Sequence, residues 1–100
     1  MARKVSLTVN GSPIKLDKFV EGYIYHIAGG IVASLKDTGA VKDLKLELKD
    51  NGDIQMKLNG RDIPLNYFAS EIIRNTLAGV VANLKGVAGE TKTLQLNIEQ

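Results

Sequence analysis

The two halves of this chain resemble each other, and this internal similarity limits the folds that it can adopt. A shift of 49 positions lays residues 5–36 over residues 54–85, and Asn10 then falls on Asn59. The other identical pairs are Gly11/Gly60, Ile14/Ile63, Leu16/Leu65, Phe19/Phe68, Ile24/Ile73, Gly30/Gly79, Val32/Val81, Ala33/Ala82, Leu35/Leu84 and Lys36/Lys85. Two copies are too few for a solenoid, which needs three or more. The pattern therefore predicts a single domain made of two repeats, about 4–49 and 53–99, related by a pseudo-twofold axis.

The stretch between the halves, residues 43–58, has the pattern of a β-hairpin. Apolar and polar residues alternate strictly on both sides of a central Asp-Asn-Gly turn, which indicates two strands that each bury one face. Because Leu48 and Ile54 must lie on the buried face, we expect them opposite each other, with a three-residue loop between Lys49 and Asp53. Such a loop usually ends in a residue with positive φ, and Gly52 stands at that position.

Each half is predicted to contain a strand, a short strand, a helix and a second long strand. In the first half these are residues 4–9, a short strand carrying Ile14 and Leu16, a helix from Asp17 to about Lys36, and residues 43–48. In the second half they are residues 54–58, a short strand carrying Ile63 and Leu65, a helix from Asn66 to about Lys85, and residues 91–98. Pro13 and Pro64 cannot donate to a strand ladder, so the two short strands are expected at the sheet edges.

The connections predict the order of the strands. A helix crossover normally returns the chain parallel to the strand that it left, and the central turn is too short to pass over another strand. Numbered along the chain, the strands are expected in the order 2-1-6-3-4-5, so that the last strand of each half pairs with the first strand of the other. The predicted fold class is α+β, a two-layer sandwich with a six-stranded antiparallel sheet and both helices on one face.

Composition excludes several kinds of site and partner. The 100 residues include no cysteine, which excludes disulfides and thiolate metal sites, and we expect no metal or other cofactor. The formal charge of +2 is too small to indicate an acidic partner. No run approaches the roughly 18 apolar residues of a membrane span, and no signal peptide is visible, so we expect no membrane association and a cytoplasmic location.

The helices are predicted to bury an apolar stripe that contains paired glycines. The expected stripes are Val20, Ile24, Ile27, Ile31 and Leu35 in the first helix, and Ile73, Val80 and Leu84 in the second. Gly30 and Gly79 fall in the middle of the expected helices, where glycine costs about 1 kcal/mol relative to alanine. We expect close packing against a helix or the sheet to offset that cost. The alternative is a groove near Gly30, Gly79 and His26 that binds a small ligand.

The helices are apolar around more than half of their circumference, which predicts a binding surface. Tyr25, Val32, Leu77 and Val81 lie outside the expected stripes. A two-layer fold buries only one broad face of each helix, so either the two helices pack these side chains against each other or a partner covers them, and a partner is favoured. We expect this partner to be a second copy of the chain or another protein.

The open sheet face offers an alternative binding site. It is expected to carry Lys4, Lys45, Lys49 and Lys57, which could contact the phosphates of a nucleic acid. The face lacks aromatic residues for stacking on bases, so a solvated surface is favoured. His26 has no second histidine or cysteine to complete a metal site, and no catalytic residue is assigned.

The sequence thus favours a non-enzymatic interaction or scaffold module that associates with itself through its helices. The two alternatives are nucleic-acid binding on the lysine-bearing sheet and a small-ligand protein or enzyme with a pocket near the glycines. Enzymatic activity is the less favoured reading, and neither substrate nor biological role follows from the sequence.

Overall fold

The computed structural model describes residues 4–35, 42–84 and 91–99. They form a six-stranded antiparallel sheet in the order β2-β1-β6-β3-β4-β5, as predicted. The strands are β1 (Lys4–Val9), β2 (Ser12–Ile14), β3 (Asp43–Leu48), β4 (Ile54–Leu58), β5 (Arg61–Ile63) and β6 (Leu94–Glu99). The three-residue strands β2 and β5 lie at the two edges of the sheet. Short edge strands leave few unpaired backbone groups for another chain to pair with.

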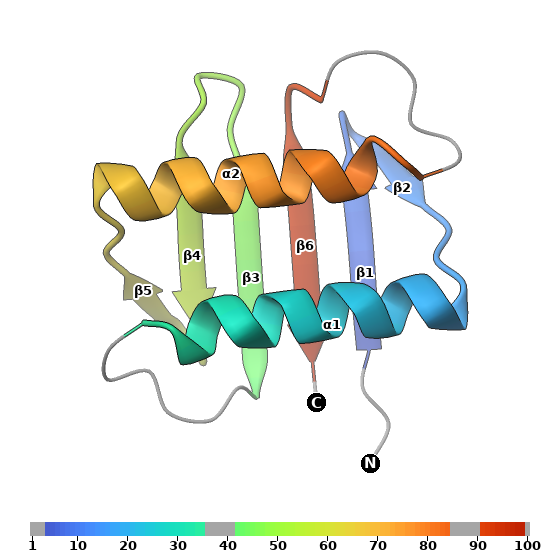
Figure 1. Cartoon of the computed structure of the whole chain (residues 1–100), viewed down its shortest axis with the longest axis horizontal. Coiled ribbons are helices and arrows are strands. Elements are labelled where there is room, and N and C mark those ends of the chain that lie inside the picture. The colour runs from blue at the N-terminus through green and yellow to red at the C-terminus, as the bar shows by residue number, and fades with distance from the viewer. Residues whose placement is uncertain (1–3, 36–41, 85–90, 100) are drawn as a thin grey trace.

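Both helices, α1 (Lys18–Ala33) and α2 (Tyr67–Val81), cover the same face of the sheet and cross its strands (Figure 1). They run antiparallel, so the first half of α1 lies beside the second half of α2, and the first half of α2 lies beside the second half of α1 (Figure 1). The predicted two-layer α+β fold is therefore confirmed. In the described residues, the other face of the sheet carries no helix.

The two halves of the chain meet at the centre of the sheet, where β3 pairs with β6. Leu46 lies opposite Leu96 in the middle of this pair, and both side chains are buried. β6 also pairs with β1, and β3 pairs with β4. The last strand of each half thus lies beside the first strand of the other, as predicted, although the interpretation of the halves as repeats stays a prediction from the sequence.

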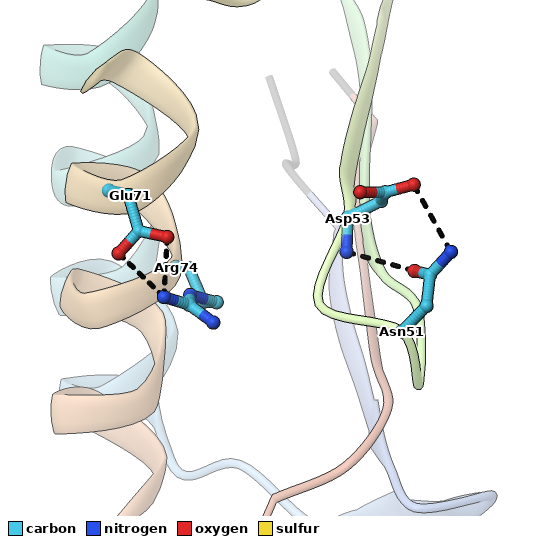
Figure 2. A network of polar contacts seen from close by, with 4 residues as sticks. All are labelled: Asn51, Asp53, Glu71 and Arg74. Atoms are coloured by element: carbon cyan, nitrogen blue, oxygen red, sulfur yellow. Dashed lines mark hydrogen bonds and ion pairs between the residues drawn. The ribbon is translucent and has the colours of Figure 1, made fainter. Parts of the chain in front are cut away.

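The turn between β3 and β4 has the predicted geometry. Leu48 lies opposite Ile54, and the N–H of Lys49 donates to the carbonyl of Asp53 at 2.9 Å. Gly52 has a φ of 92°, in a region that residues with a side chain rarely adopt. The Asn51 amide also donates to the Asp53 carboxylate and accepts from the Asp53 N–H (Figure 2).

The asparagines of two Asn-Gly turns form hydrogen bonds between the two halves of the chain. Asn10 and Asn59 have φ values of 51° and 52° and begin the two-residue loops of β1–β2 and β4–β5. The Asn10 Oδ1 accepts from the N–H of Lys92 at 2.7 Å and of Thr93 at 3.0 Å. The Asn59 Oδ1 accepts from the N–H groups before and at the start of β3, at 2.9 Å each. Each asparagine thereby positions the entry into a strand of the other half.

Both helices begin as the sequence predicts. The Asp17 carboxylate accepts from the Val20 N–H at 2.8 Å, and the Asn66 side chain accepts from the Ala69 N–H at 2.8 Å. These side chains satisfy one of the backbone N–H groups that a first helical turn leaves without a partner.

The core lies between the sheet and one row of residues on each helix. Its fully buried helix residues are Ile24, Ala28 and Val32 from α1, and Ile73, Leu77 and Val81 from α2. The predicted stripe is therefore wrong in part: Ile24 and Ile73 are buried, whereas Val20, Ile31, Leu35, Val80 and Leu84 lie at the margin of the core and Ile27 is half-buried. The reason is that each helix has two adjacent apolar rows, and the row at 24, 28 and 32 faces the sheet.

The predicted packing at the paired glycines is also wrong. α1 ends at Ala33 and α2 at Val81, so Gly30 and Gly79 lie in the last helical turns, not in the middle. A Cβ atom built on either glycine would have no neighbour within 4 Å. Their carbonyls accept side-chain hydrogen bonds from Ser34 and Asn83, at 2.9 and 3.0 Å. Such local capping bonds satisfy terminal carbonyls and favour an early helix end.

Candidate interaction surface

The outward side of the two helices carries almost no charge. Within α1 and α2, all of whose residues the structure describes, the exposed residues are Lys18, Phe19, Tyr23, His26, Gly30, Ala33, Tyr67, Phe68, Ile72, Asn75 and Gly79. Lys18, at the first position of α1, is the one lysine among them, and none is Arg, Asp or Glu. Exposed helix faces of globular proteins are normally polar and charged. We call the exposed residues after Lys18 in α1 and after Tyr67 in α2, together with the exposed cap Ala82, the helical face.

The first half of each helix exposes bulky apolar side chains on this face. Phe19 and Phe68 are 78% and 71% exposed, and Tyr23 and Ile72 are 53% and 48% exposed. The Phe19 and Tyr23 rings stack with their centroids 6.1 Å apart, so the pair forms one ridge. Large apolar side chains left in water at this density are typical of surfaces that a partner covers.

The last part of each helix, after His26 in α1 and after Asn75 in α2, is flat. Its exposed positions are Gly30 and Ala33 in α1 and Gly79 and Ala82 around the end of α2. The side chains of Phe19 and Tyr23 line an open groove of about 460 Å³ together with Gly79. This contact confirms that the ridge of α1 lies beside the flat end of α2, as the antiparallel helices require (Figure 1).

The predicted helix-surface residues are not on this face. Val32, Leu77 and Val81 are 1%, 5% and 1% exposed and belong to the core, so the expectation that they lie on exposed helix surface is wrong. Tyr25 is half-buried, packs against the core and makes an edge-to-face contact with His26. The apolar pattern of the helices predicted a partner surface, but on the row that faces the sheet.

The residues that form the surface have a signal in the sequence. Phe19, Tyr23, His26 and Gly30 recur at intervals of three and four, and no charged residue shares their row. An amphipathic helix of a two-layer fold should carry charges on that row. The missing charges, rather than the excess of apolar residues, would have located the face.

The predicted lysine surface lies on the open side of the sheet, mixed with acidic residues. Lys45 and Lys57 lie opposite each other on β3 and β4, whereas Lys4 lies opposite Glu99, which also pairs with Asp43. Lys49 follows the end of β3 and lines the rim near Asp50. The lysines therefore form no continuous basic stripe of the kind that follows a nucleic-acid backbone.

A polar hollow lies between the central turn and α2. It encloses about 790 Å³ and is lined partly by Lys49, Arg74 and Lys92. Arg74 is held by an ion pair with Glu71 one turn earlier on α2, and points toward the turn that contains Asn51 and Asp53 (Figure 2). The acidic partner offsets much of the positive charge that would attract an anion.

The potential metal-ligating side chains of the described residues do not cluster. Among residues 4–35, 42–84 and 91–99, no three His, Cys, Asp or Glu side chains are placed to hold a metal ion. His26 is exposed and does not line the groove beside Gly79. The predicted site near Gly30, Gly79 and His26 is thus not brought together as one pocket.

Comparisons with known proteins assign no family to the chain. No protein-family model, no curated protein and no solved structure matches it. In the part of the chain that the structure describes, neither helix is long and apolar enough to cross a membrane.

Proposed function

We propose that this chain is a non-enzymatic interaction module that binds a protein partner through its helical face. The observation that carries the proposal is the lack of charge on that face, combined with four large apolar side chains in water: Phe19, Tyr23, Phe68 and Ile72. Patches of this kind on soluble proteins commonly serve as protein interfaces. The cytoplasmic location expected from the sequence remains a prediction.

The aromatic content of the face supports a specific interface. Phenylalanine and tyrosine are enriched in interface cores, where charged residues are depleted. The stacked Phe19–Tyr23 pair is already ordered in the chain, so its immobilisation on binding would cost less conformational entropy than that of a free side chain. The polar sheet face, with lysines and acids interspersed, suits solvent on the other side of the molecule.

A hydrophobic dye tests whether the helical face is adhesive. In a titration with a naphthalene sulfonate dye, we expect the dye to bind the parent chain and fluoresce at concentrations where the chain is monomeric. The variant Phe19→Asn/Phe68→Asn should lose most of this fluorescence. The matched control is Lys45→Gln/Lys57→Gln on the sheet face, which should retain it. A monomeric parent that binds no more dye than the Asn variant would contradict the proposal.

A further inference from the structure

We infer that the partner of the helical face is a second copy of this chain, packed face to face about a twofold axis in the plane of the helices. This inference rests on the proposed function and names its partner. The shape of the face carries it: each helix exposes bulky apolar side chains in its first half and small residues, glycine included, at its C-terminal end.

The antiparallel helices place these halves at opposite corners. The first half of α1, to which Phe19 and Tyr23 belong, occupies one corner, and the first half of α2, to which Phe68 and Ile72 belong, occupies the corner diagonally across (Figure 1). Gly30 and Gly79 mark the remaining two corners. A twofold axis in the plane of the face, whether along the helices or across them, exchanges bulky and flat corners between the two copies. Each ridge therefore lies on a glycine corner of the partner.

The glycines are suited to receive these ridges. Among the residues that the structure describes, a Cβ on Gly30 or Gly79 would meet nothing within 4 Å, so packing against these residues does not account for the missing side chain. An exposed helix position normally carries a better helix former than glycine. In the dimer, the absence of a side chain lets the partner's aromatic rings approach the helix backbone.

The face is also large enough for a stable dimer. The molecule measures 36 × 34 Å across its two longer axes and 18 Å in depth, so a rectangle of about 1,200 Å² bounds its broad side. A stable interface buries about 800 Å² on each partner, which is less than this limit. A closed twofold dimer buries the same patch on both copies and leaves the charged sheet faces outward.

A lipid surface fits the same face less well. Helices that lie in a membrane interface usually carry lysines and arginines on their polar side. Within α1 and α2, the basic residues are Lys18, at the first position, and Arg74, which pairs with Glu71. Self-complementary shape further favours a copy of the chain over a fluid surface.

Sedimentation of glycine variants tests the inference. The parent chain should change from 10.8 kDa to twice that mass as its concentration rises. Gly30→Leu and Gly79→Leu should each raise the dimer dissociation constant about tenfold or more, because each overpacks two symmetric contacts. The control is Gly29→Leu, about 100° around the helix from Gly30, where an added Cβ also meets nothing within 4 Å. It should change the constant less than about threefold, a limit set by the modest energies of surface substitutions.

Hydroxyl-radical footprinting of the unmodified chain gives a second measurement that does not depend on variants. Phe68 should become protected as the concentration rises, whereas the adjacent Tyr67, 81% exposed and outside the face, should stay reactive.

Other results would overturn the inference in distinguishable ways. A dimer equally strong in the variants at 30, 79 and 29, with Phe68 unprotected, would place the interface elsewhere. A parent chain that stays monomeric at several hundred micromolar would exclude self-association, and dye binding by that monomer would leave the proposed function standing. If the monomer instead co-sediments with phosphatidylcholine–phosphatidylserine vesicles, the face serves a membrane and both proposals fail.

Discussion

Truncating the side chain of Asn59 should lower the free energy of unfolding, because this side chain forms hydrogen bonds between the two halves of the chain. Its Oδ1 accepts from the N–H groups of Lys42 and Asp43, and its own N–H donates to the Asp43 carbonyl at 2.7 Å. Alanine would abolish the two side-chain bonds and would have to adopt the φ of 52° of Asn59 without a polar side chain that can bond locally. Asparagine tolerates that left-handed conformation far better than alanine does.

The size of the effect follows from these two losses. Exposed hydrogen bonds contribute about 0.5–1 kcal/mol each, at the lower end of the usual range, and the left-handed conformation costs alanine up to about 1–2 kcal/mol more than it costs asparagine. Asn59→Ala should therefore destabilise the fold by about 1–4 kcal/mol, compared with the 5–15 kcal/mol typical of a domain. Asn59→Gly loses only the bonds, and Asn59→Asp keeps an acceptor oxygen and should stay within about 1 kcal/mol of the parent.

Urea unfolding followed by circular dichroism measures these differences. All variants must be compared at one protein concentration, because association of the folded state would itself shift the midpoint. The expected order of stability is parent and Asp, then Gly, then Ala, and the same order should hold at Asn10. An Asp variant as unstable as the Ala variant, or an Ala variant as stable as the parent, would show that the turn does not hold the halves together.

Three further predictions concern the core, the helix ends and the caps. Leu46→Ala and Leu96→Ala should each cost about 2–5 kcal/mol in urea unfolding, and the double variant should depart from additivity because the residues face each other; full additivity would contradict their pairing. Gly30→Ala and Gly79→Ala should stabilise the dilute monomer by up to about 1 kcal/mol, the difference in helix propensity, and so raise its melting temperature. A lower melting temperature would reveal a neighbour within the chain. Asp17→Ala should lower stability by about 1 kcal/mol, and an unchanged melting curve would argue against the cap.

Features set by local chemistry could be predicted from the sequence. Gly52 and the Asn-Gly pair at Asn59 require positive φ, and Asp17 can cap only the segment that follows it. Strict alternation on both sides of the central turn then determined the register of Leu48 against Ile54. Short connections and crossover rules left one strand order, which the structure confirms.

Which row of each helix faces the sheet could not be predicted in the same way. Ile27 is larger and more apolar than Ala28, so composition favoured the row with Ile27, yet Ala28 is the buried residue. A small residue under the helix allows close approach to the sheet, and that distance is a tertiary property. The helix ends were also missed, because Ser34 and Asn83 cap the last turns before the predicted stops.

The candidate surface was predicted in kind but not in place. Since Val32 and Val81 proved to be core residues, the uncovered apolar side chains are those on the opposite, outward side of each helix, such as Phe19 and Phe68. Locating them requires knowledge of how far each helix is rotated over the sheet. Periodicity gives that angle only where one row is clearly polar.

Isotope-filtered nuclear Overhauser spectroscopy on a mixture of labelled and unlabelled chains tests the central claim most directly. It detects contacts between copies without altering the helical face. We expect cross-peaks from the Phe19 or Phe68 ring protons of one copy to the Hα protons of Gly30 or Gly79 of the other. Intermolecular cross-peaks confined to sheet residues such as Lys45, or none at a concentration where the mass has doubled, would contradict a dimer built on the helical face.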